Sequence, residues 1–263
     1  MLFNTIEFVI FFIAVLTTFV IIKHRKFQHL FLLGASYFFF YYSSNYLLTL
    51  LIFTTIWDFY FGKMIFAAST IQRKKILLIA SLAGNLGLLG FFKYADFAIT
   101  QFNILGNYFD LGTSMPLLHL ALPIAISFYT FHSITYTVGI YRGHLNPAKT
   151  FVEYAIFVAF FPQLVAGPIL RAKEFLPQLR EKIENFGSSR LRLILLDQAN
   201  LKVGVTIMAI GFLKKMFFAD NIAPLVNDVF NYTAGTSSFT IILGTIAFAI
   251  QIYCDFSGYS DIA

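Results

Sequence analysis

The sequence ILLIASLAGNLGLLGFF, residues 76–92, contains no charged side chain. With its flanks it is close to the ~20 residues that an α-helix needs to cross the hydrocarbon of a bilayer. Its ten Leu, Ile and Phe residues each favour insertion by about 0.5 kcal/mol, or roughly 5 kcal/mol together, which outweighs its Ser, Asn and Gly. Residues 8–22 are also free of charge. The sequence therefore predicts helices that cross a membrane.

The composition of the whole chain supports this prediction. Hydrophobic residues make up 58% of the chain and charged residues 12%, whereas about 25% of an ordinary soluble domain is charged. We therefore expect an all-α polytopic membrane protein. The net charge of +6 does not indicate nucleic-acid binding, because the basic residues cluster in short stretches beside apolar spans and are not interleaved with aromatic residues. The single cysteine, Cys254, excludes an internal disulfide.

The basic residues also predict an orientation. Glu7 precedes the first apolar span and three basic residues between positions 23 and 26 follow it, which is the reverse of a cleaved signal peptide. The positive-inside rule then places the N-terminus outside the cytoplasm. The next spans alternate, with residues 43–45 forming an outer turn and residues 94–116 an outer loop. The expected spans are residues 8–22, 30–42, 46–62, 76–92, 117–140 and 236–254.

Residues 151–169 interrupt the alternation. Basic residues flank this apolar stretch on both sides, so both of its ends are expected in the cytoplasm. Pro162, Gly167 and Pro168 lie within it, where a straight helix needs backbone donors. We interpret the segment as a re-entrant hairpin, which must be buried in protein or face a wet cavity. A proline-kinked ordinary span is the alternative.

Residues 173–200 are the most polar part of the chain. Phe175, Leu179, Ile183 and Phe186 recur at steps of three and four among Lys, Arg and Glu, which predicts an amphipathic helix on the inner membrane surface. The chain shows no internal repeat and no separate soluble domain. Residues 1–263 are therefore expected to form one transmembrane domain with this interfacial helical region at about 173–200.

Ionisable residues at membrane depth are the first candidates for chemistry, because each costs roughly 2.5–3.5 kcal/mol at the centre of a bilayer and usually faces a cavity. His132 lies mid-span among hydroxyl-bearing residues; a neutral imidazole bonded to a hydroxyl and a catalytic or proton-relay role both stay open. Asp58 lies near the inner end of its span, and Lys214 and Lys215 have no clear place in the topology. No metal-ligand spacing, phosphate-binding glycine loop or dinucleotide motif occurs, so the residues alone fit a transporter as well as an enzyme.

Four motifs occur in order along the chain. They are LPIAISFYTFHSITYTVGIYRG at 122–143, FVAFFPQLVAGPILR at 157–171, FLKKMFFADNIAP at 212–224 and YCDFSGYSDIA at 253–263. Their order and spacing resemble the membrane-bound O-acyltransferase family, in its bacterial branch similar to the alginate O-acetylation membrane subunit. ASYFFFY at 35–41 also looks like the second span of that family. The resemblance runs from about residue 1 to 263.

This resemblance implies an enzyme that moves an acyl group, usually acetyl, from a cytoplasmic thioester such as acetyl-CoA to hydroxyls of an extracytoplasmic polysaccharide or cell-wall glycan. It implies a helical bundle with re-entrant segments around a tunnel, in the inner membrane of the cell, with no bound cofactor. A histidine base suits such chemistry, because it can take the hydroxyl proton as the oxygen attacks the thioester carbonyl. The expected partners are the lipid bilayer and the glycan; a periplasmic acyltransferase is left open as a further partner, and nucleic acid is not expected.

The resemblance supplies no catalytic residue. In the family the active-site histidine follows the motif that matches DFSGYSD, and none of the five histidines here maps onto it. The chain therefore resembles a C-terminally truncated, N-terminal fragment that is expected to be inactive alone. The candidate tunnel-lining or scaffold residues are His132, Tyr141, Arg142, Pro162, Gln163, Gly167, Pro168, Arg171, Asp255, Ser257, Tyr259 and Asp261.

Several alternatives stay open. Arg142 and Arg171 either anchor the chain at the cytoplasmic face or contact a phosphorylated donor, and the Asp-rich motif at 253–263 either caps and packs a helix or belongs to the site. For the whole chain, the alternatives to an acyltransferase are a transporter or flippase of a polar metabolite and a noncatalytic scaffold that relays acyl groups. One strong helix break, at 162–168, favours the enzyme, because inverted-repeat transporters have paired breaks.

Overall fold

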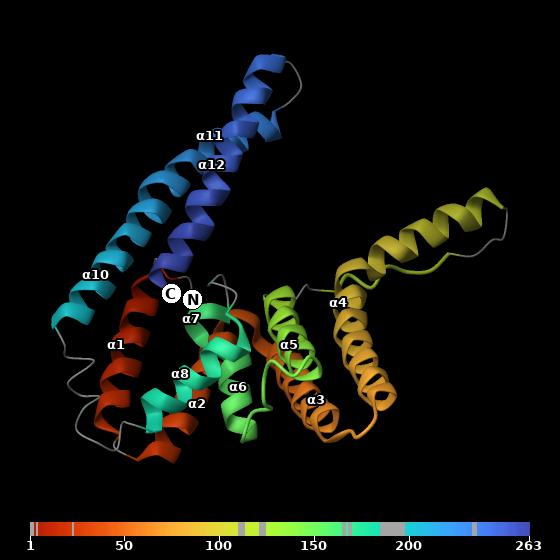
Figure 1. Ribbon diagram of the computed structural model, residues 1–263. Helices are drawn as coiled ribbons and strands as arrows, with labels where there is room; N and C mark the ends of the chain where they lie inside the picture. The colour runs from red at the N-terminus through yellow and green to blue at the C-terminus, as the bar shows by residue number, and fades with distance from the viewer. Residues whose placement is uncertain are drawn as a thin grey trace. The chain divides into compact units, whose positions relative to one another are not determined.

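The computed structural model describes residues 3, 5–22, 24–109, 114–120, 125–164, 167, 170–184, 198–232 and 236–263. Every regular element in these ranges is helical (Figure 1). The α-helices are α1 (Ile6–Ile21), α2 (Arg25–Ser44), α3 (Leu48–Ala67), α4 (Ile71–Tyr108), α5 (Ile126–Tyr141), α6 (Phe151–Ala159), α7 (Phe161–Leu164), α8 (Ala172–Glu184), α10 (Gln198–Phe212), α11 (Asp220–Asn231) and α12 (Ser238–Ile262). A 3-10 turn, η1 (Asn45–Leu47), and a π-helical segment, η3 (Leu213–Ala219), complete the set.

Three helical stretches of the described chain are long and apolar enough to cross a membrane: Lys26–Ala67, Ile71–Tyr108 and Ser238–Ile262. Ile6–Phe19 is a shorter apolar helix. The predicted spans at 8–22, 30–42, 46–62, 76–92 and 236–254 fall on α1, α2, α3, α4 and α12. For the described residues, the expected all-α architecture with helices long and apolar enough to cross a membrane is therefore confirmed.

Hydroxyl side chains define where several of these helices begin. The Oγ1 atoms of Thr5, Thr70 and Thr150 accept hydrogen bonds from backbone N–H groups three residues later, and the Ser237 Oγ does the same at the start of α12. Each bond satisfies one of the donors that a helix leaves unpaired in its first turn. The helix starts are thus local sequence signals, independent of the membrane.

The connections differ from the expectation in two places. The turn at 43–45 is confirmed, because α2 ends at Ser44 and Asn45 has a φ of 48°. Residues 94–108, predicted as the first part of an outer loop, are instead helical, because α4 continues to Tyr108. The predicted span 117–140 is also shorter, because its helix α5 begins only at Ile126. Asn103 is a common loop residue, but here it stays in the helix while its side chain binds Met115.

The break predicted in residues 151–169 is present. Helix α6 has nine residues, and at 1.5 Å per residue it is roughly 14 Å long, too short to cross a bilayer. Phe160 separates it from α7, which contains Pro162. That both ends share one side of the membrane stays a prediction, and residues 165–166 and 168–169 lie outside the described ranges.

Helix α8 has the amphipathic character that was predicted for the start of residues 173–200. Phe175 and Leu176 are buried while Lys173 and Glu174 are exposed. Phe186 and the side chain of Ile183 lie outside the described residues. The placement of this region on the inner membrane surface stays a prediction.

The chain divides into two compact units, which are described separately. The first comprises Met1–Leu32, Val165–Pro168 and Arg180–Ala263, and the second comprises Leu33–Leu164 and Ile169–Leu179. That residues 1–263 form one transmembrane domain stays a prediction.

In the second unit, α3, α4 and α5 pack against one another, and α6 packs against α3 and α5. Gly62 of α3 makes this packing possible, because a Cβ there would lie 2.6 Å from the Tyr136 ring of α5. The largest fully buried side chains of this unit include Tyr129, Tyr136 and Tyr154.

In the first unit, α12 packs against α10, η3 and α11. The helices cross closely at two glycines: a Cβ on Gly258 would lie 2.9 Å from the Gly211 carbonyl oxygen, and a Cβ on Gly211 would lie 2.8 Å from that of Gly258. Such small-residue contacts let helix backbones approach closely in membrane proteins. Side chains on either helix near this crossing are therefore brought into direct contact.

Candidate functional site

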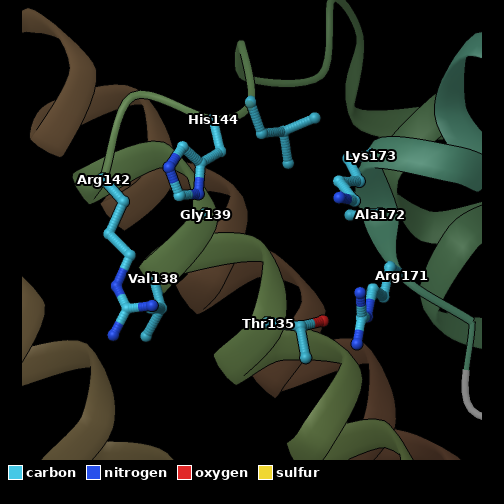
Figure 2. A pocket seen from close by; sticks show the side chains of 9 residues that line it. Thr135, Val138, Gly139, Arg142, His144, Arg171, Ala172 and Lys173 are labelled. Atoms are coloured by element: carbon cyan, nitrogen blue, oxygen red, sulfur yellow. The ribbon is translucent and has the colours of Figure 1, made fainter.

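A basic pocket lies in the second unit, between the end of α5, the loop after it and the start of α8. Its volume is about 340 Å³, at the small end of the range of ligand pockets. Figure 2 shows basic side chains entering from two sides: Arg142 and His144 from the end of α5 and its loop, and Arg171 and Lys173 from the facing chain. The pocket is lined by Thr135, Val138, Gly139, Arg142, His144, Leu145, Arg171, Ala172 and Lys173.

The end of α5 explains why Arg142 and His144 meet here. The N–H of Gly143 donates to the Ile140 carbonyl (3.0 Å), and that of His144 donates to the Gly139 carbonyl (2.9 Å). Gly143 has a φ of 73°, which glycine adopts without the penalty of a side chain. This is the Schellman motif, which satisfies the last carbonyls of a helix and turns the chain back. It holds the two basic residues on either side of the turn.

The charge of the pocket limits what it can bind. Four of its side chains are basic and none is acidic, and Arg142, His144, Arg171 and Lys173 are all exposed. Arginine can donate two parallel hydrogen bonds to a phosphate or carboxylate, and lysine adds a mobile positive charge. The pocket therefore suits an anionic group, above all a phosphate.

A second polar cluster of this unit surrounds Asp58 in the middle of α3. The Asp58 side chain of α3 is fully buried. Ser81 of α4 donates its hydroxyl to Oδ1 (2.8 Å), and the Asn85 Nδ2 donates to Oδ1 (2.8 Å) and Oδ2 (2.9 Å). Ser81 and Asn85 are themselves buried and lie one turn apart in the charge-free stretch of α4. No lysine or arginine pairs with this carboxyl group in the described part of the chain.

The polar interior continues across α5 and α6. The hydroxyls of Ser133 and Tyr154 are 3.2 Å apart, and the Tyr136 hydroxyl accepts a hydrogen bond from the Ala148 N–H (3.0 Å). His132 is also buried, and its ring packs on Phe157 with centroids 5.4 Å apart. Its imidazole interacts with the backbone at Val158, although neither nitrogen makes a well-formed hydrogen bond within the described residues. His132 is not one of the residues that line the basic pocket.

The first unit carries a charged seam, which we define as Lys214, Lys215, Asp220, Asp255 and Asp261. The Lys214 Nζ lies 2.6 Å from Asp261 and 2.9 Å from the Ser257 hydroxyl. The Lys215 Nζ lies 2.8 Å from Asp220 and 2.5 Å from Asp255, and 5.2 Å above the Tyr259 ring. The π-helical segment η3 carries both lysines, and each of them pairs with an aspartate of α12.

The candidate residues therefore fall in different places. Asp255, Ser257, Tyr259 and Asp261 lie in the last turns of α12. There the Ser257 hydroxyl and the two carboxylates contact the lysines of η3, and the Tyr259 ring lies below Lys215. Tyr141 ends α5, and Arg142 and Arg171 share the basic pocket. Pro162 and the buried Gln163 lie in α7, Gly167 is buried, and Pro168 lies outside the described residues. Sequence reasoning missed the pairing of Lys214 and Lys215 and the partners of Asp58.

Comparison with known proteins gives these features a context. The chain is 33% identical over 267 residues to the probable alginate O-acetylase AlgI of Pseudomonas putida. The alignment covers 100% of this chain and 52% of the relative. The chain is a homologue of O-acetyltransferases over its full length. The corresponding protein of Pseudomonas aeruginosa is 34% identical over 270 residues (100% of this chain, 48% of the relative). A peptidoglycan O-acetyltransferase of Helicobacter pylori is 32% identical over 293 residues (100% and 53%).

This homology confirms the resemblance drawn from the four motifs. The chain spans about half the length of the curated relatives it matches. No protein-family model matches the chain. The homologues act on alginate or peptidoglycan according to their names.

Proposed function

We propose that this protein takes part in O-acetyl transfer from a cytoplasmic thioester donor, such as acetyl-CoA, to hydroxyls of an extracytoplasmic polysaccharide or cell-wall glycan. The basic pocket is the observation that carries the proposal for this chain, since it offers a place for the phosphates of such a donor. The homology to alginate and peptidoglycan O-acetyltransferases supplies the reaction class.

The location of the pocket fits a donor that arrives from the cytoplasm. Arg142 and Arg171 belong to basic stretches that the positive-inside rule assigns to that side of the inner membrane. In this orientation the N-terminus lies outside the cytoplasm. Because the pocket has a volume of about 340 Å³, at the small end of the range of ligand pockets, we expect it to hold the phosphates of the donor and not the whole donor.

The reaction forms an ester bond and breaks a thioester bond. The acceptor oxygen attacks the carbonyl carbon, the sulfur leaves as a thiol, and the hydroxyl proton is transferred to that sulfur directly or through a base. None of the described residues of this chain is assigned as the base. The pocket residues bind and orient the donor, which is a large part of catalysis when two substrates must meet.

The test is acetyl transfer in membranes from cells that express the natural gene product. Labelled acetyl-CoA is supplied to inside-out vesicles, and ester-linked label is measured on isolated glycan. In the double variant Arg142→Ala with Arg171→Ala, each lost phosphate contact is expected to raise the donor KM about tenfold or more, with a smaller effect on kcat. The matched control is Arg73→Ala with Lys75→Ala, two exposed basic residues near the start of α4.

Three outcomes would contradict parts of the proposal. An unchanged donor KM in the pocket variant would show that the donor binds elsewhere. Equal losses in the pocket variant and the control would point to a general role of positive charge. If no label reached glycan even with unaltered protein, but a periplasmic acyltransferase restored it, the chain would relay acyl groups and would not complete the transfer itself.

A further inference from the structure

Helix α4 is too long for one crossing of a bilayer. It has 38 residues, which at 1.5 Å per residue make roughly 57 Å, about twice the thickness of the hydrocarbon core. Residues 76–92 account for the charge-free crossing. Figure 1 shows that the C-terminal part of α4 turns away from its N-terminal part and carries the following chain alongside it. We call residues 93–109 with residues 114–120 the arm.

The arm is an ordered element held by its own polar side chains. The carboxamide of Asn103 donates to the Met115 carbonyl and accepts from the Met115 N–H, both at 2.8 Å. The Asp96 Oδ1 accepts a hydrogen bond from the Leu118 N–H, also at 2.8 Å. Side chains of α4 therefore replace the backbone partners that the extended chain 114–120 would otherwise lack.

Five polar residues of the arm helix lie on one face. Lys93, Asp96, Thr100, Asn103 and Asn107 follow one another at steps of three and four, which is the spacing of one helical face. Asp96 and Asn103, which bind the extended chain, belong to this face. These hydrogen bonds hold the extended chain 114–120 against the polar face of the arm helix.

A second face of the arm helix, beside the polar one, carries large apolar side chains that are exposed and has Gln101 among them. Tyr94, Phe97, Leu105 and Tyr108 share this face by their spacing, and their exposed fractions range from 54% to 82%. Phe102 and Phe109, which flank it, are 46% and 64% exposed. Soluble surfaces rarely leave so many large apolar side chains together in water.

We propose that the arm helix lies along the membrane surface, on the side where α4 leaves the bilayer, with Tyr94, Phe97, Leu105 and Tyr108 immersed in the headgroup region. The apolar face is continuous along one helix with a membrane-crossing segment, so lipid is already its neighbour at one end. Aromatic rings are enriched at that depth in membrane proteins, and a helix with separate apolar and polar faces can lie in the membrane interface. A glycan fits this face less well, because it needs carboxylates or amides beside the rings to bind its hydroxyls. Gln101 is the one such side chain on this face, and the Tyr94 and Tyr108 hydroxyls add the other polar groups.

The experiment uses tryptophan fluorescence and brominated lipid. The chain has a single tryptophan, Trp57, so Trp57→Phe gives a background without it. Leu105→Trp and Tyr108→Trp place the probe on the apolar face, and Asn107→Trp places it on the polar face between them in sequence. Each protein is reconstituted in phosphatidylcholine vesicles brominated either near the headgroup end or near the terminal end of the acyl chains.

Bromine near the headgroup should quench the probes at 105 and 108 about twofold or more relative to the probe at 107, and more than bromine near the chain ends does. Tyr108→Trp is a mild exchange of one ring for another, so it keeps the test valid if Leu105→Trp disturbs the arm. Equal quenching at 105 and 107 would overturn the proposal. Stronger quenching by deep bromine would show a second crossing, and protection at 105 and 108 from both bromine and aqueous acrylamide would show that protein covers the face.

Discussion

The two units of this protein surround their charged side chains with different kinds of partner. In the second unit the Asp58 carboxyl group is fully buried and receives hydrogen bonds from a hydroxyl and an amide, both neutral. In the first unit the charged seam pairs two lysines with three aspartates, and its side chains are 13–42% exposed.

The difference follows from contact with solvent. A fully buried ion pair must remove two charges from water, and the attraction between them often fails to offset that cost. Neutral donors stabilise a buried carboxyl group while losing much less hydration themselves. Where water still reaches the charges, as in the seam, opposite charges can pair at little cost and contribute little. The comparison predicts that the neutral cluster matters more for stability than the charged seam.

The largest effect is expected at Asp58. Asp58→Ala leaves the Ser81 hydroxyl without its acceptor, leaves the Asn85 amide with only the Ser81 carbonyl, and opens a small cavity. Together these losses should cost about 3–5 kcal/mol of unfolding free energy. Asp58→Asn keeps the size of the side chain and one acceptor oxygen, so its cost should be about 1–2 kcal/mol. Unfolding of the purified protein in mixed micelles, titrated with sodium dodecyl sulfate, measures both. If Asp58→Asn lowered the unfolding free energy as much as Asp58→Ala does, the charge of Asp58 and not its hydrogen bonds would hold the cluster together.

A smaller effect is expected at the helix crossing that builds the seam. A Cβ on Gly258 would lie 2.9 Å from the Gly211 carbonyl oxygen and 3.0 Å from the Lys215 nitrogen, so Gly258→Ala should force α12 away from η3 at a cost of about 1–3 kcal/mol. The same titration measures the change.

Gly204→Ala on α10 is the matched control. A Cβ on Gly204 meets no atom within 4 Å, and alanine favours the helix, so this variant should be as stable as the parent or slightly more so. If both variants lost the same amount of unfolding free energy, these helices would not tolerate alanine in place of glycine in general, and the loss at Gly258 would not be due to the close crossing.

Sequence patterns predicted the membrane helices because each depends on one contiguous apolar run and a local cap, such as Thr70 before α4. They failed at residues 94–108 because Asn103, Gly106 and Asn107 are common loop residues. In the structure Asn103 keeps its place in the helix while its side chain binds a separate segment of chain. No local pattern contains that partner.

The same limit applies to the candidate site. Arg142 and Arg171 could be selected from their motifs, but only the fold shows that they line one pocket. Lys214 and Lys215 had no clear place in the topology, because their partners Asp255 and Asp261 lie a helix away in sequence. Asp58 could be recognised as a charge at membrane depth, whereas its donors Ser81 and Asn85 looked like tolerated polar residues in a long apolar run.

The smallest effect is expected in the seam itself, and its dependence on solution conditions sharpens the comparison. Lys215→Met should cost about 1 kcal/mol or less, because its partners Asp220 and Asp255 are each 42% exposed and can be solvated by water instead. The control is Lys202→Met, which removes an exposed lysine of α10. Raising the salt concentration should shrink the loss caused by Lys215→Met, since exposed pairs are screened, and should leave the loss caused by Asp58→Ala unchanged.

The pH dependence of the seam has a definite sign. Burial alone lowers the pKa of Lys215, but its hydrogen bonds to Asp220 and Asp255 outweigh this and raise that pKa above its ordinary value. A lysine whose pKa is raised by folding stabilises the folded state fully below its unfolded pKa of about 10.4, and the contribution is lost only as the pH rises through the folded pKa. The difference in unfolding free energy between the parent and Lys215→Met should therefore be constant from neutral pH to mildly alkaline pH. A difference that declined within that range, or one that resisted salt, would show that the seam behaves as a buried site like the Asp58 cluster and would remove the distinction between the two units.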